Sequence, residues 1–264
     1  MSVVYILAHL DDEYCALPLI WEAQREGLPQ RFIYLADYRD KALATRRLAE
    51  THAFLGAQGL PAETVRPIGL GRGAFDGQLH KACGQLLSEV MTEIAQAGPV
   101  SRLVVPAWEG GHMDHDACAW LGVRAGERIA APVRQFSLYN GPGLPGPLLR
   151  AAAPLPQNGP VTRLDPGLGD RLRWLAWVRA FPSQAYAWSG IWPAMAWSLA
   201  RRGFGWQALE AARVLERPHP GPLFYERMFK VPYAEVRQAL DAADQAGVRP
   251  MTTRPARIRP TPAQ

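Results

Sequence analysis

The chain has 264 residues, of which 48% are hydrophobic and 20% charged, and its net charge is +5. This length is sufficient for one large α/β domain with a sizeable core, and the composition is typical of a soluble globular protein. Four arginines and no acid lie in residues 246–264, so the rest of the chain carries 25 basic and 24 acidic residues. The body of the protein is therefore close to neutral, and we expect no nucleic-acid partner.

The two ends and the cysteines give further expectations. Residues 246–264 are rich in proline and threonine without hydrophobic periodicity, which predicts a basic, disordered tail. The N-terminal stretch MSVVYILAHLDDE lacks a positive region and soon meets acids, so we expect no signal peptide and a cytoplasmic protein. Cys15, Cys83 and Cys118 are odd in number and form no CxxC pair, which argues against a disulfide framework or a thiolate zinc site.

Strand-like and helical patterns alternate over the first 140 residues. Short apolar runs predict strands at 3–8, 31–36, 64–68, 102–106 and 133–139. Helical patterns lie between them, at about 13–26, 41–55, 77–97 and 115–129. This order predicts an α/β fold of the Rossmann-like, doubly wound type, with a mostly parallel sheet.

The rest of the chain is expected to extend the same domain, with a core at 1–140 and a C-terminal part at 141–245. Residues 141–169 are dense in glycine and proline and predict a long surface excursion. Residues 170–215 are helical in character and hold six of the nine tryptophans, which predicts a helical layer packed on the sheet. Arg179, Pro182 and Pro193 interrupt this segment, so it is no membrane span. An interfacial membrane element and a homo-oligomer contact stay open as alternatives. Residues 218–229 are interpreted as an edge strand.

Two clusters of histidines and acids follow two strands of the predicted sheet. The stretch AHLDDE at 8–13 follows the first strand, and PAWEGGHMDH at 106–115 follows the fourth. In the usual doubly wound order these two strands are neighbours across the switch point, where ligands bind beyond the carboxyl ends. We therefore expect six side chains to face one another there, namely His9, Asp11, Asp12, His112, Asp114 and His115.

These residue types are suited to a metal-dependent hydrolase. Two imidazoles and one carboxylate form a common catalytic zinc set that leaves a position for water, and the same ligands suit Fe²⁺ or Co²⁺. A further carboxylate is then free to act as a base, and a further histidine to polarise the substrate. The alternative is that the acids serve helix starts, with Asp114 or Asp116 as a cap.

The two motifs closely resemble the paired signatures of the PIG-L/LmbE-like N-acetylglucosaminyl deacetylases, usually Ala-His-Pro-Asp-Asp-Glu and His-Pro-Asp-His. The resemblance covers residues 1 to about 140. It implies one zinc ion bound by three ligands, His9, Asp12 and His115. It also implies that Asp11 is the general base and that His112, paired with Asp114, stabilises the oxyanion. Leu10 and Met113 replace the prolines of the family pattern, at positions that offer no ligand.

Three further residues are candidates for substrate binding. The family tends to carry an Arg-x-x-Glu pair on the helix after the second strand, and Arg47 with Glu50 matches that pattern. Trp108 and Glu109 precede the second motif at a strand end, where they are candidates to stack on and hydrogen-bond a sugar ring; an ordinary loop position is the alternative.

The function expected from these observations is a zinc-dependent N-deacetylase acting on a small-molecule amino sugar or sugar conjugate of the N-acetylglucosamine type. In the expected mechanism Asp11 accepts a proton from the attacking water, and a protonated His112 stabilises the oxyanion. A metal-dependent phosphoesterase or another amidase is an alternative, although a phosphoesterase generally needs more carboxylates and a basic lining. A non-catalytic nucleotide-binding module is a third possibility, which the carboxylates after the first strand disfavour because they repel phosphate.

Overall fold

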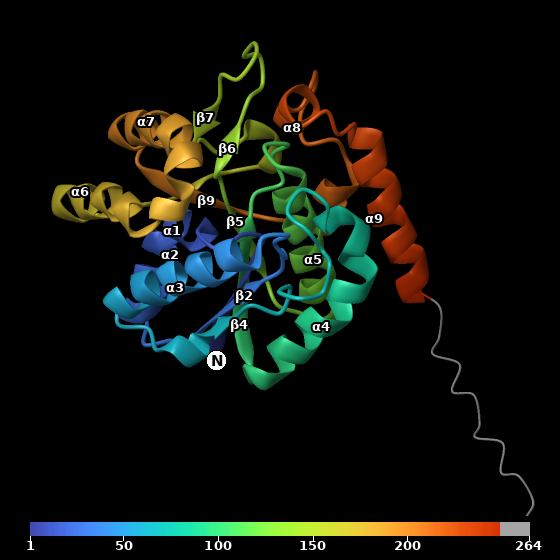
Figure 1. Cartoon of the computed structure of the whole chain (residues 1–264), viewed down its shortest axis with the longest axis horizontal. Coiled ribbons are helices and arrows are strands. Elements are labelled where there is room, and N and C mark those ends of the chain that lie inside the picture. Colours follow the sequence, from blue (N-terminus) through green and yellow to red (C-terminus); the bar gives the residue numbers. More distant parts are fainter. Residues whose placement is uncertain (249–264) are drawn as a thin grey trace, which may run out of the picture.

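A seven-stranded sheet runs through the centre of the protein (Figure 1). The computed structural model describes residues 1–248. In spatial order the strands are β3 (Val65–Arg66), β2 (Gln30–Tyr34), β1 (Ser2–Leu7), β4 (Val100–Pro106), β5 (Val133–Phe136), β9 (Phe204–Ala208) and β8 (Thr162–Leu164). The first five are parallel, and β9 and β8 add an antiparallel edge. The predicted α/β fold with its mostly parallel sheet is therefore confirmed.

Two hydrophobic layers cover the faces of this sheet. One contains α1 (Asp12–Cys15), α2 (Leu17–Arg25), α3 (Lys41–Ala57), α6 (Leu168–Ala176) and α7 (Ala185–Arg202). The other contains α4 (Cys83–Gln96), α5 (Met113–Ile129) and α9 (Tyr233–Val248). Strand β1 shows why both layers form: Val3 and Tyr5 pack into the first layer, whereas Val4 and Ile6 pack into the second. A strand covered on both faces needs apolar residues at every position, as this sequence provides.

The C-terminal half differs from the expectation in three places. Residues 204–208 form strand β9 of the main sheet, so the segment 170–215 is not helical throughout. The excursion at 141–169 contributes the edge strand β8, and a small hairpin joins β6 (Tyr139–Asn140) to β7 (Arg150–Ala151). The predicted edge strand at 218–229 is instead helix α8 (Phe224–Met228), because Glu226 accepts the Leu223 N–H at 2.7 Å and closes its first turn.

Short 3-10 turns complete the chain: η1 (Ala62–Thr64), η2 (Leu79–Ala82), η3 (Pro156–Asn158), η4 (Trp177–Ala180), η5 (Pro182–Gln184) and η6 (Ala211–Leu215).

Helix α9 reaches Val248, three residues into the predicted tail, and the rest of that tail lies outside the described residues. The three cysteines are buried and unpaired. Among the described helices, none is both long and apolar enough to cross a bilayer.

Candidate metal centre

The two sequence motifs meet where β1 and β4 end side by side. His9 follows β1, Asp12 begins α1, and His115 lies in the first turn of α5. His115 Nε2 is 3.3 Å from His9 Nδ1 and 3.1 Å from Asp12 Oδ1, and all three side chains are buried. Donor atoms around a tetrahedral zinc ion, at bond lengths of about 2.0–2.1 Å, are separated by about 3.3 Å. The three predicted ligands therefore have a spacing that fits such an ion.

The Asp12 carboxylate is oriented by the main chain. Its Oδ2 accepts the N–H groups of Ala8 and His9, both at 2.9 Å, which leaves Oδ1 directed at His115. Burial opposes ionisation of Asp12, but His115 and His9 outweigh it and hold the pKa of this carboxyl well below its usual range. Asp12 is therefore an ionised, pre-oriented candidate ligand.

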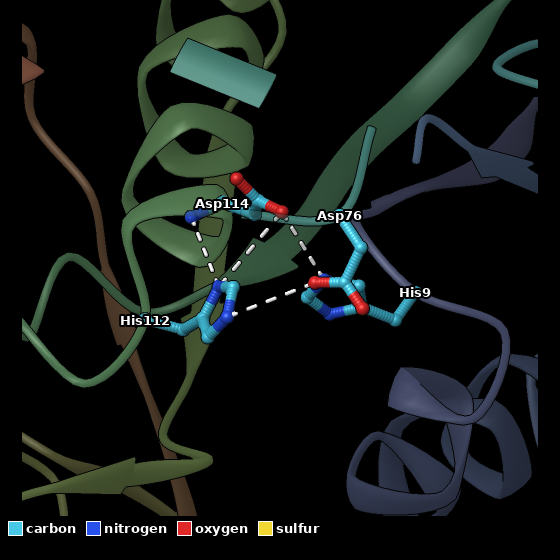
Figure 2. A group of neighbouring side chains, drawn as sticks. All are labelled: His9, Asp76, His112 and Asp114. Atoms are coloured by element: carbon cyan, nitrogen blue, oxygen red, sulfur yellow. Dashed lines mark hydrogen bonds and ion pairs between the residues drawn. The ribbon is translucent and has the colours of Figure 1, made fainter. Parts of the chain in front are cut away.

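A second group of side chains faces the other ring nitrogen of His9. Figure 2 shows four side chains that converge: His9 from the end of β1, Asp76 from the loop before α4, and His112 and Asp114 from the start of α5. His9 Nε2 lies 3.2 Å from both Asp76 Oδ1 and Asp114 Oδ2. Burial lowers the pKa of His9, but the carboxylates of Asp76, Asp114 and Asp12 outweigh burial and raise it above its ordinary value. These carboxylates therefore favour the protonated form of His9.

Asp76 was missed by the sequence analysis. It follows the glycine-rich stretch GLGRGAF at 69–75 and precedes Gly77. It forms no recognised metal-ligand motif with its neighbours in the sequence. Its main chain is fixed to Asp37, whose carbonyl accepts the Asp76 N–H at 2.9 Å. The Asp76 carboxylate is 43% exposed and lines the cavity described below, 3.9 Å from His112 Nε2. The glycines before Asp76 were the only feature of the sequence that could have indicated a functional loop here.

His112 is a neutral hydrogen-bond donor in this arrangement. It is the N-cap of α5, and its Nδ1 accepts the Asp114 N–H at 3.2 Å, so the ring proton lies on Nε2. Burial lowers the pKa of His112 to about 4. The helix start is therefore capped by His112, and neither Asp114 nor Asp116 serves as the N-cap.

Asp114 is held mainly by the main chain of the loop before α4. Its carboxylate accepts the N–H groups of Gly77 at 2.6 Å and Leu79 at 2.9 Å. It lies 3.9 Å from His112 Nδ1, which is beyond hydrogen-bonding distance, and is closer to His9. The resemblance implied that Asp114 pairs with His112. In the structure the main-chain N–H of Asp114, and not its carboxylate, makes the hydrogen bond to His112.

Asp11 is held in an unusual backbone conformation beside the proposed ligands. Its φ is 146°, a region that L side chains rarely adopt, and its N–H donates to Glu13 Oε2 at 3.0 Å. Its carboxylate accepts the indole N–H of Trp188 from α7 at 3.0 Å. Burial first and the neighbouring Asp12 second raise the pKa of Asp11 to about 7.

Arg47 lies at the cavity on helix α3. Its guanidinium donates to Gln184 Oε1 at 2.8 Å and lies over the ring of Tyr38. One turn further along α3, Glu50 accepts the N–H of Ser183 at 3.0 Å and its hydroxyl at 2.5 Å. The Arg-x-x-Glu pair thus fastens the turn before α7 to α3.

Trp108 and Glu109 do not line the cavity. Trp108 is fully buried, with its indole N–H donating to the Glu216 carbonyl at 3.0 Å. Glu109 is 1% exposed and accepts hydrogen bonds from Ser137, Leu138 and Asn140, which fastens the segment after β5. The expected sugar contacts of these two residues are therefore incorrect, because the chain turns them into the interior before it reaches His112.

A cavity of about 390 Å³ opens over the proposed ligands. Its polar side is formed by both motifs together with Arg47 and Asp76, and its apolar side includes Leu138, Tyr139, Tyr186, Ile191 and Phe229. This volume is at the lower end of the range for small-molecule sites. The apolar wall comes from three segments that are distant along the chain.

No protein-family model matches the sequence, and no curated protein matches it. Solved structures do match. A deacetylase of the teicoplanin biosynthesis pathway aligns with a TM-score of 0.57 and 18% identity, over 79% of this chain and 97% of that chain. The N,N'-diacetylchitobiose deacetylase from Pyrococcus horikoshii aligns with a TM-score of 0.54 and 12% identity, over 83% of this chain and 87% of that chain. The chain has the fold of these deacetylases.

This deacetylase fold also occurs in a conserved protein from Thermus thermophilus, with a TM-score of 0.55 and 15% identity over 84% of this chain and 99% of that chain. The likeness covers 79–84% of this chain, so it extends beyond residue 140. The resemblance drawn from the two short motifs is confirmed at the level of the fold.

Proposed function

We propose that the protein is a metal-dependent N-deacetylase that hydrolyses the acetamide of an N-acetylglucosamine-like amino sugar or sugar conjugate. The observation that carries this proposal is the convergence of His9, Asp12 and His115 beside Asp11, in a cavity of about 390 Å³. A monosaccharide unit is a suitable occupant for a cavity of that size. The deacetylase fold of the solved neighbours supports the same reaction class.

The residues fit a bound divalent cation, with zinc as the proposed ion and Fe²⁺ or Co²⁺ as alternatives. His9, Asp12 and His115 would hold it, because two imidazoles and one carboxylate leave one position for water. Such an ion supplies Lewis acidity and lowers the pKa of water from about 15.7 toward about 7.

Asp11 is the proposed general base. Its pKa of about 7 in the metal-free site allows it to accept a proton from the attacking water near neutral pH and to pass that proton to the departing amine. The hydrogen bond from Trp188 and the constrained backbone hold the carboxylate in one position. Acetate and a free amino sugar are the products.

His112 is the proposed donor to the developing oxyanion. Because its Nδ1 accepts a main-chain N–H, its Nε2–H faces the cavity and can donate to negative charge on the acetamide oxygen. Such a pre-positioned donor typically contributes about 3–4 kcal/mol to the transition state. The role assigned here belongs to the neutral imidazole, in contrast to the protonated form expected from the sequence.

Arg47 is the proposed substrate-binding residue. Its guanidinium reaches the cavity between Tyr38 and Gln184, where its remaining N–H groups can donate to sugar hydroxyls. Trp108 and Glu109 are no longer proposed for this role, since both are buried away from the cavity.

The test compares two variants of the full chain, Asp11→Asn and His115→Ala, for bound metal and for acetate released from N-acetylated sugars. Asp11→Asn is expected to retain the metal and lose turnover, whereas His115→Ala is expected to lose both. His52→Asn, a histidine on helix α3 away from the cavity, is the matched control and should change neither quantity. Full turnover in a wild-type protein stripped of metal would overturn the proposal.

A further inference from the structure

Helix α7 presents an uncharged aromatic face to solvent. No charged residue occurs from Ala185 to Ala200. The side chains of Tyr186 and Trp197, three turns apart on the outer face, are 95% and 64% exposed. The solvent-facing side of a helix in a globular protein ordinarily carries charged and polar residues. This side of α7 therefore has the composition of a contact surface.

Helix α6 extends that surface. Leu168 and Leu172, one turn apart, are 73% and 59% exposed, and the opposite side of α6 buries Trp174. Helices α6 and α7 lie side by side on one flank of the protein (Figure 1), joined by a hydrogen bond of 3.0 Å from the indole of Trp192 to the Leu175 carbonyl. We call residues 161–203 the α6–α7 flank.

The α6–α7 flank also carries a net positive charge. It contains six arginines and two aspartates, a net charge of +4, whereas the rest of residues 1–248 contains 19 basic and 22 acidic residues. Both aspartates form ion pairs, Asp165 with Arg171 and Asp170 with Arg173. Five arginines are exposed on the flank: Arg163, Arg173, Arg179, Arg201 and Arg202. The Arg201 guanidinium lies over the ring of Trp197, 5.2 Å from its centroid.

We propose that the α6–α7 flank binds the surface of an anionic lipid bilayer. Tryptophan and tyrosine are favoured at the headgroup level, leucines enter the acyl boundary, and nearby arginines are attracted to anionic headgroups. A two-fold contact with a second copy is disfavoured, because it would place two surfaces of charge +4 against each other. Single-stranded nucleic acid would use the aromatic rings but would leave the exposed leucines without a partner.

The flank borders the mouth of the cavity. Tyr186, Ala187 and Ile191 of α7 line that cavity while their helix forms the proposed bilayer surface. A bilayer seated on the flank would therefore bring lipid headgroups to the cavity mouth. This consequence rests on the proposed deacetylase function and favours an amino sugar carried on a lipid, whereas bilayer binding itself is independent of activity.

The experiment measures flotation of the full-length protein with vesicles of phosphatidylcholine alone and of equimolar phosphatidylcholine and phosphatidylglycerol. The wild type is expected to float with the anionic vesicles only, and less so at high salt. Arg201→Gln and Arg202→Gln are each expected to weaken binding roughly fivefold, and Trp197→Ser by a similar factor. Leu215→Ser and Arg128→Gln are the matched controls, since both residues are exposed and lie on η6 and α5, outside the flank.

Thermal melting of each variant checks that the fold is intact, because all five positions are exposed. Failure of the wild type to float with anionic vesicles, or equal losses in the two controls, would overturn the proposal. Two other results would also overturn it. One is a wild-type dimer that binds no lipid and that Trp197→Ser dissociates. The other is a wild-type protein that binds a single-stranded oligonucleotide but no vesicles. A wild-type protein that binds anionic vesicles but has no deacetylase activity would overturn the proposed function and leave the proposal of bilayer binding intact.

Discussion

The indole N–H of Trp188 donates a hydrogen bond of 3.0 Å to Asp11 Oδ2, and 177 positions separate the two residues in the chain. This contact joins helix α7 to the proposed general base. A hydrogen bond to a carboxylate stabilises its charged form, so Trp188 lowers the pKa of Asp11 against the larger, opposite effect of burial. Helix α7 therefore both forms part of the cavity wall and lowers the pKa of Asp11.

Trp188→Phe should raise the pKa of Asp11 by removing this hydrogen bond. The acidic limb of the kcat/KM profile is then expected to move to higher pH by about one unit, with the fold retained. Trp192→Phe is the matched control, because it removes an indole hydrogen bond of the same length on the same helix, to the Leu175 carbonyl. An unchanged pH profile in Trp188→Phe would show that the contact is only structural.

Zinc affinity should fall as the pH is lowered. His9 must lose its proton to bind an ion, and its raised pKa means that it keeps this proton to a higher pH than an ordinary histidine does. Below that pKa, one proton displaced per ion weakens binding about tenfold per pH unit. Titration calorimetry in buffers of different ionisation enthalpy counts the released protons. Affinity that is independent of pH between about 5 and 8 would contradict the assignment of His9 as a ligand.

Gly111→Ala should disturb the loop that carries His112. A Cβ atom at this position would lie 1.9 Å from the Tyr139 carbonyl oxygen, so the loop or the β6 strand must shift. The expected loss is about 1–3 kcal/mol in the free energy of unfolding, together with lower turnover. Gly56→Ala on helix α3 is the control, because nothing lies within 4 Å of its Cβ and a gain of about 0.5–1 kcal/mol is expected. Denaturant unfolding of both variants decides between these outcomes.

Arg47→Ala should weaken substrate binding more than it slows the reaction. Removing a charged donor to sugar hydroxyls is expected to raise KM roughly tenfold. Arg46→Ala is the control, because the neighbouring arginine is exposed on the same helix and does not line the cavity. A fall in kcat with an unchanged KM would instead show that Arg47 does not bind the substrate, and that its role is to position the turn at Ser183 and Gln184.

The fold core was predictable because its signals are local. Val3, Val4, Tyr5 and Ile6 form an unbroken apolar run, and such a run is expected only where both faces of a strand are covered. Strand β9 was missed because its sequence FGWQA continues the tryptophan-rich composition of α7, although Gly203 already ends that helix. Helix α8 was missed because its first turn depends on the Glu226 side chain, which a proline-rich context obscured.

The sequence by itself determined where the proposed ligands lie, since parallel strands end at one edge and the motifs follow two strands that are neighbours in the sheet. Only the tertiary structure decided which side chains surround them. Trp188 and Asp76 come to the cavity from α7 and from a glycine-rich loop, whereas Trp108 turns into the core. The reason is physical: periodicity and capping depend on neighbours along the chain, but a buried contact between distant segments depends on how whole helices and loops pack.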